Sequence, residues 1–223
     1  MLQRKLLVVF FVAIFFSQKE VVFAQVGVVD IHHAFQVAVA RHVDVAFRVG
    51  MGPVNSIHTS GVDVGGGRVI TIYVDPARFG KGASELGEVT LNGEQANVVK
   101  TDREVGLTLL RYATLTTANN LASPEIGNPK LLEQLVGTEI VGNSISVAFG
   151  SVFQITPGVV HMSQMLTTTG GTANYTGAGL FSRNGALVGI VSGLESNIPG
   201  HGAHTLMIPG AVLQKFLGTG VAV

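Results

Sequence analysis

Residues 65–74 read Gly-Gly-Gly-Arg-Val-Ile-Thr-Ile-Tyr-Val, a glycine turn that leads directly into a run of β-branched and apolar residues. Glycine adopts the backbone conformations that tight turns need, and β-branched residues favour extended strands. We therefore predict a strand over residues 67–74. The same texture of short runs separated by Gly, Pro, Asn and Asp continues through most of the chain. It predicts further strands over residues 43–49, 88–91, 96–100, 107–112, 139–141, 144–149, 152–162, 180–181, 186–192 and 205–208.

Many short strands at such spacing are typical of a β-sandwich or a β-barrel. Two helices are expected to accompany them. The Asp30 carboxylate can accept amide hydrogens in the first turn of a short helix, which carries His32, His33, Phe35, Val37 and Val39. A second helix over Gly210–Leu217 carries Val212, Leu213, Phe216 and Leu217 on one face. The predicted fold class is therefore all-β, with a short N-terminal and a C-terminal helix.

The composition of the 223-residue chain excludes several classes of protein. Hydrophobic residues make up 47% and charged residues 13%, a mixture typical of a folded domain. The 14 basic residues balance the 14 acidic ones, so no broad positive field is available to hold nucleic acid. Because the chain has no cysteine, it can form no disulfide, thiolate metal site or cysteine nucleophile. We expect no cofactor and no nucleic-acid partner.

The N-terminus has the pattern of a secretory signal peptide. Arg4 and Lys5 precede an unbroken apolar run over residues 6–16, and Ala24 offers a small residue before a cleavage point. The run is shorter than the roughly 20 residues that span a bilayer. We therefore expect residues 1–24 to be removed and residues 25–223 to lie in the periplasm or outside the cell. The alternative is an uncleaved segment that tethers the domain to a membrane.

Two segments in the first half of the chain resemble one protease family. Residues 65–71 are similar to the glycine turn and strand that lead into the catalytic His of trypsin-like serine proteases, closest to the HtrA (Deg) type. Residues 89–93 (Val-Thr-Leu-Asn-Gly) and 102–111 (Asp-Arg-Glu-Val-Gly-Leu-Thr-Leu-Leu-Arg) resemble the hairpin and strand that carry the catalytic Asp. The resemblance places Val74 at the His position, or Tyr73 if one residue is deleted. It places Gly106 at the Asp position.

The second half continues the resemblance in the same order. Residues 174–180, Asn-Tyr-Thr-Gly-Ala-Gly-Leu, are similar to the family's nucleophile loop, with Thr176 at the nucleophile position. Residues 185–192 resemble the strand that lies beside a bound peptide, and residues 204–209 resemble the strand before the terminal helix. The resemblance implies two six-stranded antiparallel β-barrels. We expect a first barrel over about 43–113, a second barrel over about 131–209 and a helix over about 210–217. Residues 114–130, rich in Thr, Asn, Ala and Pro, are the candidate for the crossing between the barrels.

The residues at the three catalytic positions argue against proteolysis. A hydroxyl attacks a carbonyl only when a neighbouring base takes its proton and a third group orients that base. Val74 and Gly106 can do neither, and the Tyr73 phenol is a poor base at neutral pH. Thr176 keeps a hydroxyl, but its methyl group stiffens χ1 and crowds the attack. We therefore predict a catalytically inactive homologue, a pseudoprotease.

The remnant of such a site can still bind a ligand. Asn174 stands where the family's oxyanion hole has a Gly, and Asn enters positive φ more readily than most residues. The loop is then either an inherited structural turn or an amide cradle for a carboxylate or a peptide C-terminus. Pairing of an extended peptide with the strand at residues 191–193 needs no triad. The resemblance implies a cleft formed by Asn174, Tyr175, Val191, Ser192, Gly193 and His204.

Three functions follow as alternatives. The first is an exported module that binds a peptide or protein in the former substrate cleft. The second is an endopeptidase in which Thr176 is activated by a His from another loop, either His204 or His58. The third is an exported metal-binding protein that uses His201 and His204, with a carboxylate such as Glu195, because zinc normally takes at least three protein ligands.

Overall fold

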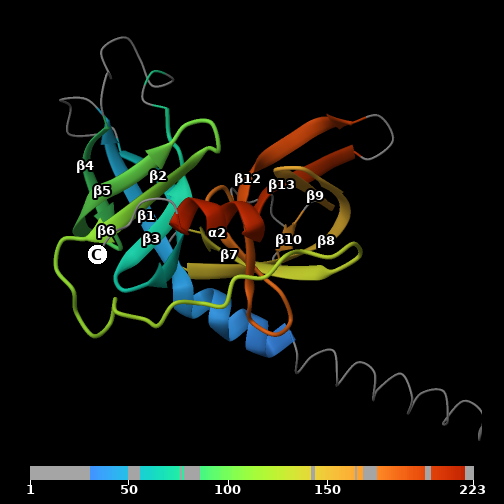
Figure 1. Ribbon diagram of the computed structural model, residues 1–223, viewed down its shortest axis with the longest axis horizontal. Coiled ribbons are helices and arrows are strands. Elements are labelled where there is room, and N and C mark those ends of the chain that lie inside the picture. The colour runs from blue at the N-terminus through green and yellow to red at the C-terminus, as the bar shows by residue number, and fades with distance from the viewer. Residues whose placement is uncertain are drawn as a thin grey trace, which may run out of the picture.

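The computed structural model describes residues 31–49, 56–75, 77, 86–141, 144–163, 165–167, 175–198 and 202–218. These residues form two β-barrels that lie side by side, with helix α2 between them (Figure 1). The predicted signal segment and its cleavage point, the capping residue Asp30, and Asn174 and His201 lie outside the described residues. No helix within the described part of the chain is both long and apolar enough to cross a membrane.

The first barrel is a closed antiparallel ring of six strands in the order β1-β2-β3-β6-β5-β4. Along β1, Val43, Val45 and Phe47 are buried, whereas the alternate residues face outward, as the period of a strand requires. The buried residues meet Val69 and Leu110 in the barrel core. The strands are β1 His42–Val49, β2 Ser56–Gly65, β3 Arg68–Ile72, β4 Leu86–Leu91, β5 Glu94–Asp102 and β6 Leu107–Tyr112.

The second barrel is a ring in the order β8-β7-β11-β12-β13-β9, closed by pairing of β8 with β9. Leu135, Met162, Leu180 and Met207 are fully buried in its core. The two-residue strand β10 (Leu166–Thr167) adds to β8 outside the ring. The ring strands are β7 Gln134–Val141, β8 Ser144–Thr156, β9 Val159–Ser163, β11 Gly179–Phe181, β12 Leu187–Ile198 and β13 Gly202–Pro209. The predicted pair of six-stranded antiparallel barrels is confirmed.

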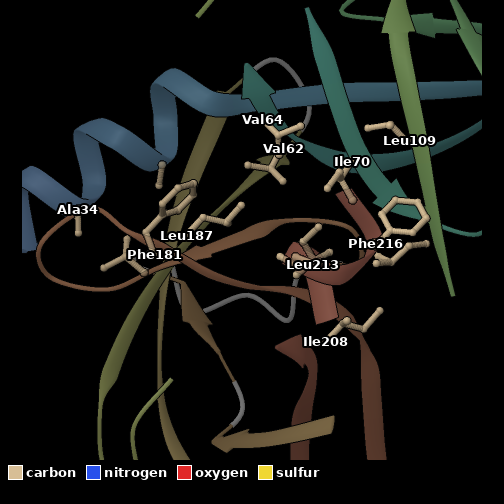
Figure 2. Packing of buried hydrophobic residues seen from close by; sticks show 14 residues of the cluster. Ala34, Val62, Val64, Ile70, Leu109, Phe181, Leu187, Ile208, Leu213 and Phe216 are labelled. Carbon is tan, nitrogen blue, oxygen red and sulfur yellow. The ribbon is translucent and has the colours of Figure 1, made fainter. Parts of the chain in front are cut away.

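A third hydrophobic cluster fills the space between the barrels and the helices. The N-terminal helix (residues 31–41) contributes Ala34 and Ala38, and α2 (Gly210–Gly218) contributes Leu213 and Phe216. Figure 2 shows side chains from both helices and both barrels converging in this cluster. The barrels contribute Val62, Val64, Ile70, Leu107, Leu109, Val136, Phe181, Leu187, Ile190 and Ile208. Both predicted helices are present, and both complete this shared core.

Several strand predictions were wrong. The predicted break between residues 149 and 152 is absent, because β8 runs without interruption over Ser144–Thr156, and the short strand β10 was not predicted. Residues 152–162 do not form one strand, because a turn with Gly158 at φ 84° separates β8 from β9. Strand β2 was not predicted at all, and His58, predicted in a loop, lies within it. The sequence Ser-Ile-His-Thr-Ser-Gly-Val-Asp-Val-Gly is polar at its start, and its second half is buried on both faces, so its apolar residues do not alternate clearly.

The loop before β11 joins the second barrel to β2 of the first. The Thr176 carbonyl accepts hydrogen bonds from the Ser60 amide at 3.1 Å and from the Thr59 hydroxyl at 2.7 Å. Gly177 follows at φ 88° with its α-carbon against the Ser60 carbonyl. A Cβ atom at this position would overlap that oxygen. Glycine is therefore required here both by the backbone angle and by the close approach of the barrels.

Replacing Gly177 with alanine is expected to destabilise the fold by at least about 3 kcal/mol, since backbone strain adds to an overlap with a fixed carbonyl. Gly158→Ala is the matched control, because Gly158 has φ 84° but no neighbouring atom within 4 Å of the added Cβ. The control should cost about 1 kcal/mol. Urea unfolding of both variants measures the difference, and equal costs would contradict the proposed close contact.

His42 forms a second bridge between the barrels. The Thr138 hydroxyl of β7 donates to the Ala38 carbonyl at 3.4 Å, so it accepts from His42 Nδ1 at 3.0 Å. The Nε2 atom of His42 is buried without a hydrogen-bond partner. Burial lowers the pKa of His42, opposed by the negative charge of Asp44 and the hydrogen bond to Thr138. The folded protein therefore favours the neutral imidazole.

Because the folded pKa of His42 lies below that of the unfolded chain, this group stabilises the protein at neutral pH relative to acid pH. Its contribution is lost as the pH falls below about 6.5, the ordinary value for His. We expect the free energy of unfolding to decrease less between pH 7.5 and 5.5 in His42→Gln than in the wild type. Urea denaturation at both pH values measures this, and identical decreases would refute the assignment.

Candidate functional site

A cleft of about 530 Å³ lies where the two barrels meet helix α2. Its described walls come from three parts of the chain, namely the ends of β3 and β6, the second barrel and α2. Apolar side chains dominate, and the polar groups are the Tyr73 phenol, the Glu104 carboxylate and the Ser192 hydroxyl. The described lining residues are Ile72, Tyr73, Glu104, Val105, Gly106, Gly158, Val159, Ser192, Ile208 and Val212.

Strand pairing explains why Tyr73 and Gly106 meet in this cleft. Strands β3 and β6 are antiparallel with Ile72 opposite Leu107, so the end of β3 lies beside the start of β6. The Tyr73 amide donates to the Gly106 carbonyl at 2.8 Å. The structure thus brings together the alternative His position and the Asp position that the family resemblance implies. The Arg103 guanidinium also lies 5.6 Å from the centre of the Tyr73 ring, within the range of a cation–π contact.

Val74, the first candidate for the His position, does not line the cleft. Its side chain is buried in the core of the first barrel with Val45, Phe47 and Leu91. The half-buried Tyr73 faces the cleft instead. The sequence alone left both positions open, because the choice depends on where β3 ends and how the chain leaves the barrel.

The Asp102 carboxylate is occupied by hydrogen bonds within the turn before Gly106. Asp102 Oδ1 accepts hydrogen bonds from the amides of Glu104 at 3.1 Å and Val105 at 3.0 Å, and the Asp102 carbonyl accepts from the Gly106 amide at 2.9 Å. Such side-chain bonds to the next residues stabilise a tight turn. Gly106 adopts φ 80°, which favours glycine. The Asp102 carboxylate is therefore a structural group of the turn, and the exposed Glu104 is the acidic residue among the described lining residues of the cleft.

On the opposite wall, a β-bulge exposes Ser192. Val191 pairs with Met207 and Gly193 with the adjacent Leu206, so Ser192 is an extra residue on β12. Bulges redirect a side chain out of the regular pattern, which places Ser192 in the cleft. Val191 and Tyr175, also predicted for the cleft, are instead buried in the core of the second barrel. Gly193 is half-buried and is not among the described lining residues.

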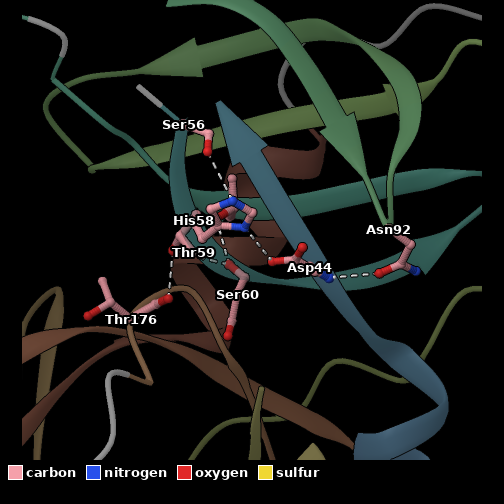
Figure 3. Close-up of polar contacts among 8 residues, drawn as sticks. Asp44, Ser56, His58, Thr59, Ser60, Asn92 and Thr176 are labelled. Atoms are coloured by element: carbon pink, nitrogen blue, oxygen red, sulfur yellow. Dashed lines mark hydrogen bonds and ion pairs between the residues drawn. The ribbon is translucent and has the colours of Figure 1, made fainter. Parts of the chain in front are cut away.

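The half-buried Thr176 is likewise not among the described lining residues. Its carbonyl, rather than its hydroxyl, faces Thr59 and Ser60 in Figure 3. The two histidines proposed as its base contact other groups. His58 lies on β2, where its ring nitrogens contact Ser56 and Asp44.

The other candidate base, His204, is fully buried, and its Nε2 atom lies 3.1 Å from His161 Nδ1. The edge of the His204 ring also meets Phe153, with centroids 5.7 Å apart. Sequence reasoning did not single out His161, because the antiparallel pairing of β9 with β13 that brings it beside His204 has no local sequence signal.

The described histidines are arranged differently from the predicted metal site, because His204 contacts His161. Glu195 is opposite His204 in the register of β12 and β13. His201 lies outside the described residues, and His204 contacts His161. Among the described residues no group of three or more His, Cys, Asp or Glu side chains is placed to hold a metal ion. The use of His201, His204 and Glu195 as ligands stays a prediction.

The described cleft can bind a ligand by apolar contact and hydrogen bonding. Its polar side chains can accept or donate hydrogen bonds, but no imidazole is among its described lining residues. A scan of the sequence against models of known protein families finds no match. A search of curated proteins likewise finds no similar sequence. The double barrel is consistent with the trypsin-like fold, and this architecture is the feature that supports the resemblance.

Proposed function

We propose that this chain is an exported relative of trypsin-like proteases that is catalytically inactive at the family's catalytic positions and binds an extended peptide or protein segment in the cleft between its barrels. One observation carries the proposal: the cleft joins Tyr73 and Gly106, at two of the family's catalytic positions, to Ser192 at the bulge of β12. The cleft therefore holds the alternative His position and the Asp position, whereas Thr176, at the nucleophile position, is not among its described lining residues. Apolar walls with a few polar groups are typical of ligand sites.

The hydrogen-bonding pattern of β12 supports strand addition. Val191 exchanges hydrogen bonds with the loop before β11, donating to Ala178 at 2.9 Å and accepting from Gly177 at 2.8 Å. Beyond Val191, β12 pairs with β13 alone among the described strands. An extended peptide can continue the sheet from this point, with main-chain hydrogen bonds supplying affinity and the apolar cleft supplying selectivity.

Hydrolysis is not expected in this cleft. Acyl transfer to a hydroxyl needs a base within hydrogen-bond reach and a group that orients it. Gly106 has no side chain, Tyr73 carries a phenol, and the Asp102 carboxylate is already bonded to turn amides. The cleft can therefore bind a peptide without transferring its acyl group to a hydroxyl.

Val74→His should destabilise the protein more than Tyr73→His does. Val74 is buried among apolar residues, so Val74→His places a polar ring in the core of the first barrel. This substitution should lower the free energy of unfolding by about 2–4 kcal/mol. Tyr73→His is the matched control, because Tyr73 is half-buried beside the cleft, and it should cost about 1 kcal/mol or less. Urea unfolding compares the two variants. A Val74→His protein as stable as the wild type would show that this side chain does not fill the core.

Peptide binding is tested with a peptide selected on the wild-type protein from a displayed random library. Val159→Glu places a charge in the cleft wall and should weaken binding roughly tenfold or more, because apolar contact is replaced by a charge that must be desolvated. Val98→Glu is the control, since Val98 is 48% exposed on β5 and does not line the cleft. Fluorescence anisotropy should detect less than about a twofold effect of the control.

Two results would overturn this function. One is a selected peptide whose affinity does not change in Val159→Glu. The other is cleavage of an unstructured protein substrate that disappears in Thr176→Ala. Amide hydrogen exchange provides the positive signature, because strand addition should protect residues 192–194 when the peptide is bound.

A further inference from the structure

A hydrogen-bonded chain of Ser, His and Asp lies on the outer face of the first barrel. Ser56 Oγ is 3.2 Å from His58 Nε2, and His58 Nδ1 is 3.4 Å from Asp44 Oδ1 (Figure 3). None of these three residues lines the cleft. We propose that they form a separate nucleophilic site that accepts acyl groups from carboxylic esters.

The register of β1 and β2 explains how the three residues meet. Arg48 is opposite Ser56, Ala46 opposite His58, and Asp44 opposite Ser60. Because side chains alternate along a strand, Asp44, Ala46 and Arg48 share the outer face of β1. The small Ala46 leaves the imidazole of His58 room to extend over β1 toward its diagonal neighbour Asp44. Diagonal contacts of this kind are within the reach of a long side chain.

The contacts determine which nitrogen of His58 acts as the base. A carboxylate can only accept a hydrogen bond, so the contact with Asp44 requires the proton on Nδ1. The lone pair of Nε2 then faces the Ser56 hydroxyl and can take its proton. This is the division of labour that nucleophilic catalysis requires: nucleophile, base and orienting carboxylate. Catalytic hydrogen bonds are often longer before substrate binds, as the distance to Asp44 is here.

Asn92 holds the orienting residue in place. The Asp44 backbone amide donates to Asn92 Oδ1 at 2.8 Å, and the Asn92 backbone amide donates to the Asp44 carbonyl at 2.8 Å. This double contact fixes the backbone of Asp44. Arg48 is opposite Ser56 in the register, but its side chain forms a 3.2 Å ion pair with Glu88 of β4, which lies on the other side of β1 from β2.

The proposed reaction is acyl transfer from an ester. Ser56 Oγ bonds to the acyl carbon while His58 Nε2 takes its proton, and the bond from the acyl carbon to the alcohol oxygen breaks. The alcohol leaves with the proton from His58, and the acyl group stays on Ser56. Water then repeats the step and releases a carboxylic acid. Ser56 and His58 lie on an exposed strand face, so the expected substrates are esters with accessible carbonyls and good leaving groups, such as aryl esters.

The test is covalent labelling of the full chain with a fluorophosphonate, followed by mapping of the adduct by mass spectrometry. We expect one adduct, on Ser56, that disappears in Ser56→Ala. His58→Gln should slow labelling roughly 100-fold, because the base is removed. Ser123→Ala is the control, since Ser123 is also exposed but is not part of the chain of contacts, and labelling should be unchanged. Circular dichroism confirms that each variant is folded.

Asp44 is a positioning residue, and its test uses the proton on His58. Nitrogen NMR of the imidazole should show the proton on Nδ1 in the neutral ring of the wild type and a shift toward Nε2 protonation in Asp44→Asn. In the same variant, labelling of Ser56 should slow roughly tenfold or more. The proposal is overturned if Ser56 is not labelled, or if its labelling is unaffected by His58→Gln. An adduct on Thr176 instead would overturn it and would also contradict the inactive cleft, whereas no adduct at all leaves the proposed binding function standing.

Discussion

The Thr176 carbonyl oxygen accepts two hydrogen bonds from β2, and this contact holds the second barrel against the first. It is possible only because Gly177 has no side chain where the Ser60 carbonyl approaches. Around this junction the interbarrel cluster buries one face of each helix, and His42 adds a bond to Thr138. The relative placement of the barrels, and with it the cleft, therefore depends on backbone atoms in the loop before β11 together with the apolar packing around them.

The same junction shapes the cleft without a contribution from any catalytic side chain. Its geometry depends on backbone hydrogen bonds, on glycine and on apolar packing, none of which requires a catalytic side chain. Gly106 keeps its turn because Asp102 bonds to the following amides, and Ser192 keeps its position because of a bulge. In the proposed pseudoprotease, the walls of the cleft therefore do not depend on a proton-transferring group. A protein of this kind can lose reactivity while it keeps a shaped surface for a ligand.

The sequence predicted the parts of this structure that have local signals. A glycine turn followed by β-branched residues marked β3, a run of apolar residues marked β6, and the resemblance to trypsin-like proteases predicted two barrels. Strand β2 was missed because Gly61 and Asp63 interrupt its apolar pattern and both its faces are buried at that end. The choice between Tyr73 and Val74, and the contact of His161 with His204, depend on register across strands far apart in the sequence. No local pattern contains that information.

Strand β2 takes part both in the junction between the barrels and in the proposed nucleophilic site on the outer face. Its second half is buried, and there Ser60, with the hydroxyl of the neighbouring Thr59, holds the second barrel. Its first half extends past the junction, and there Ser56 and His58 face solvent beside β1. A strand positions side chains more rigidly than a loop does, so pairing with β1 can orient His58 toward Asp44 without any contribution from the cleft. Because the residues at the junction are not those on the outer face, chemistry on that face can change while the packing of the barrels stays the same.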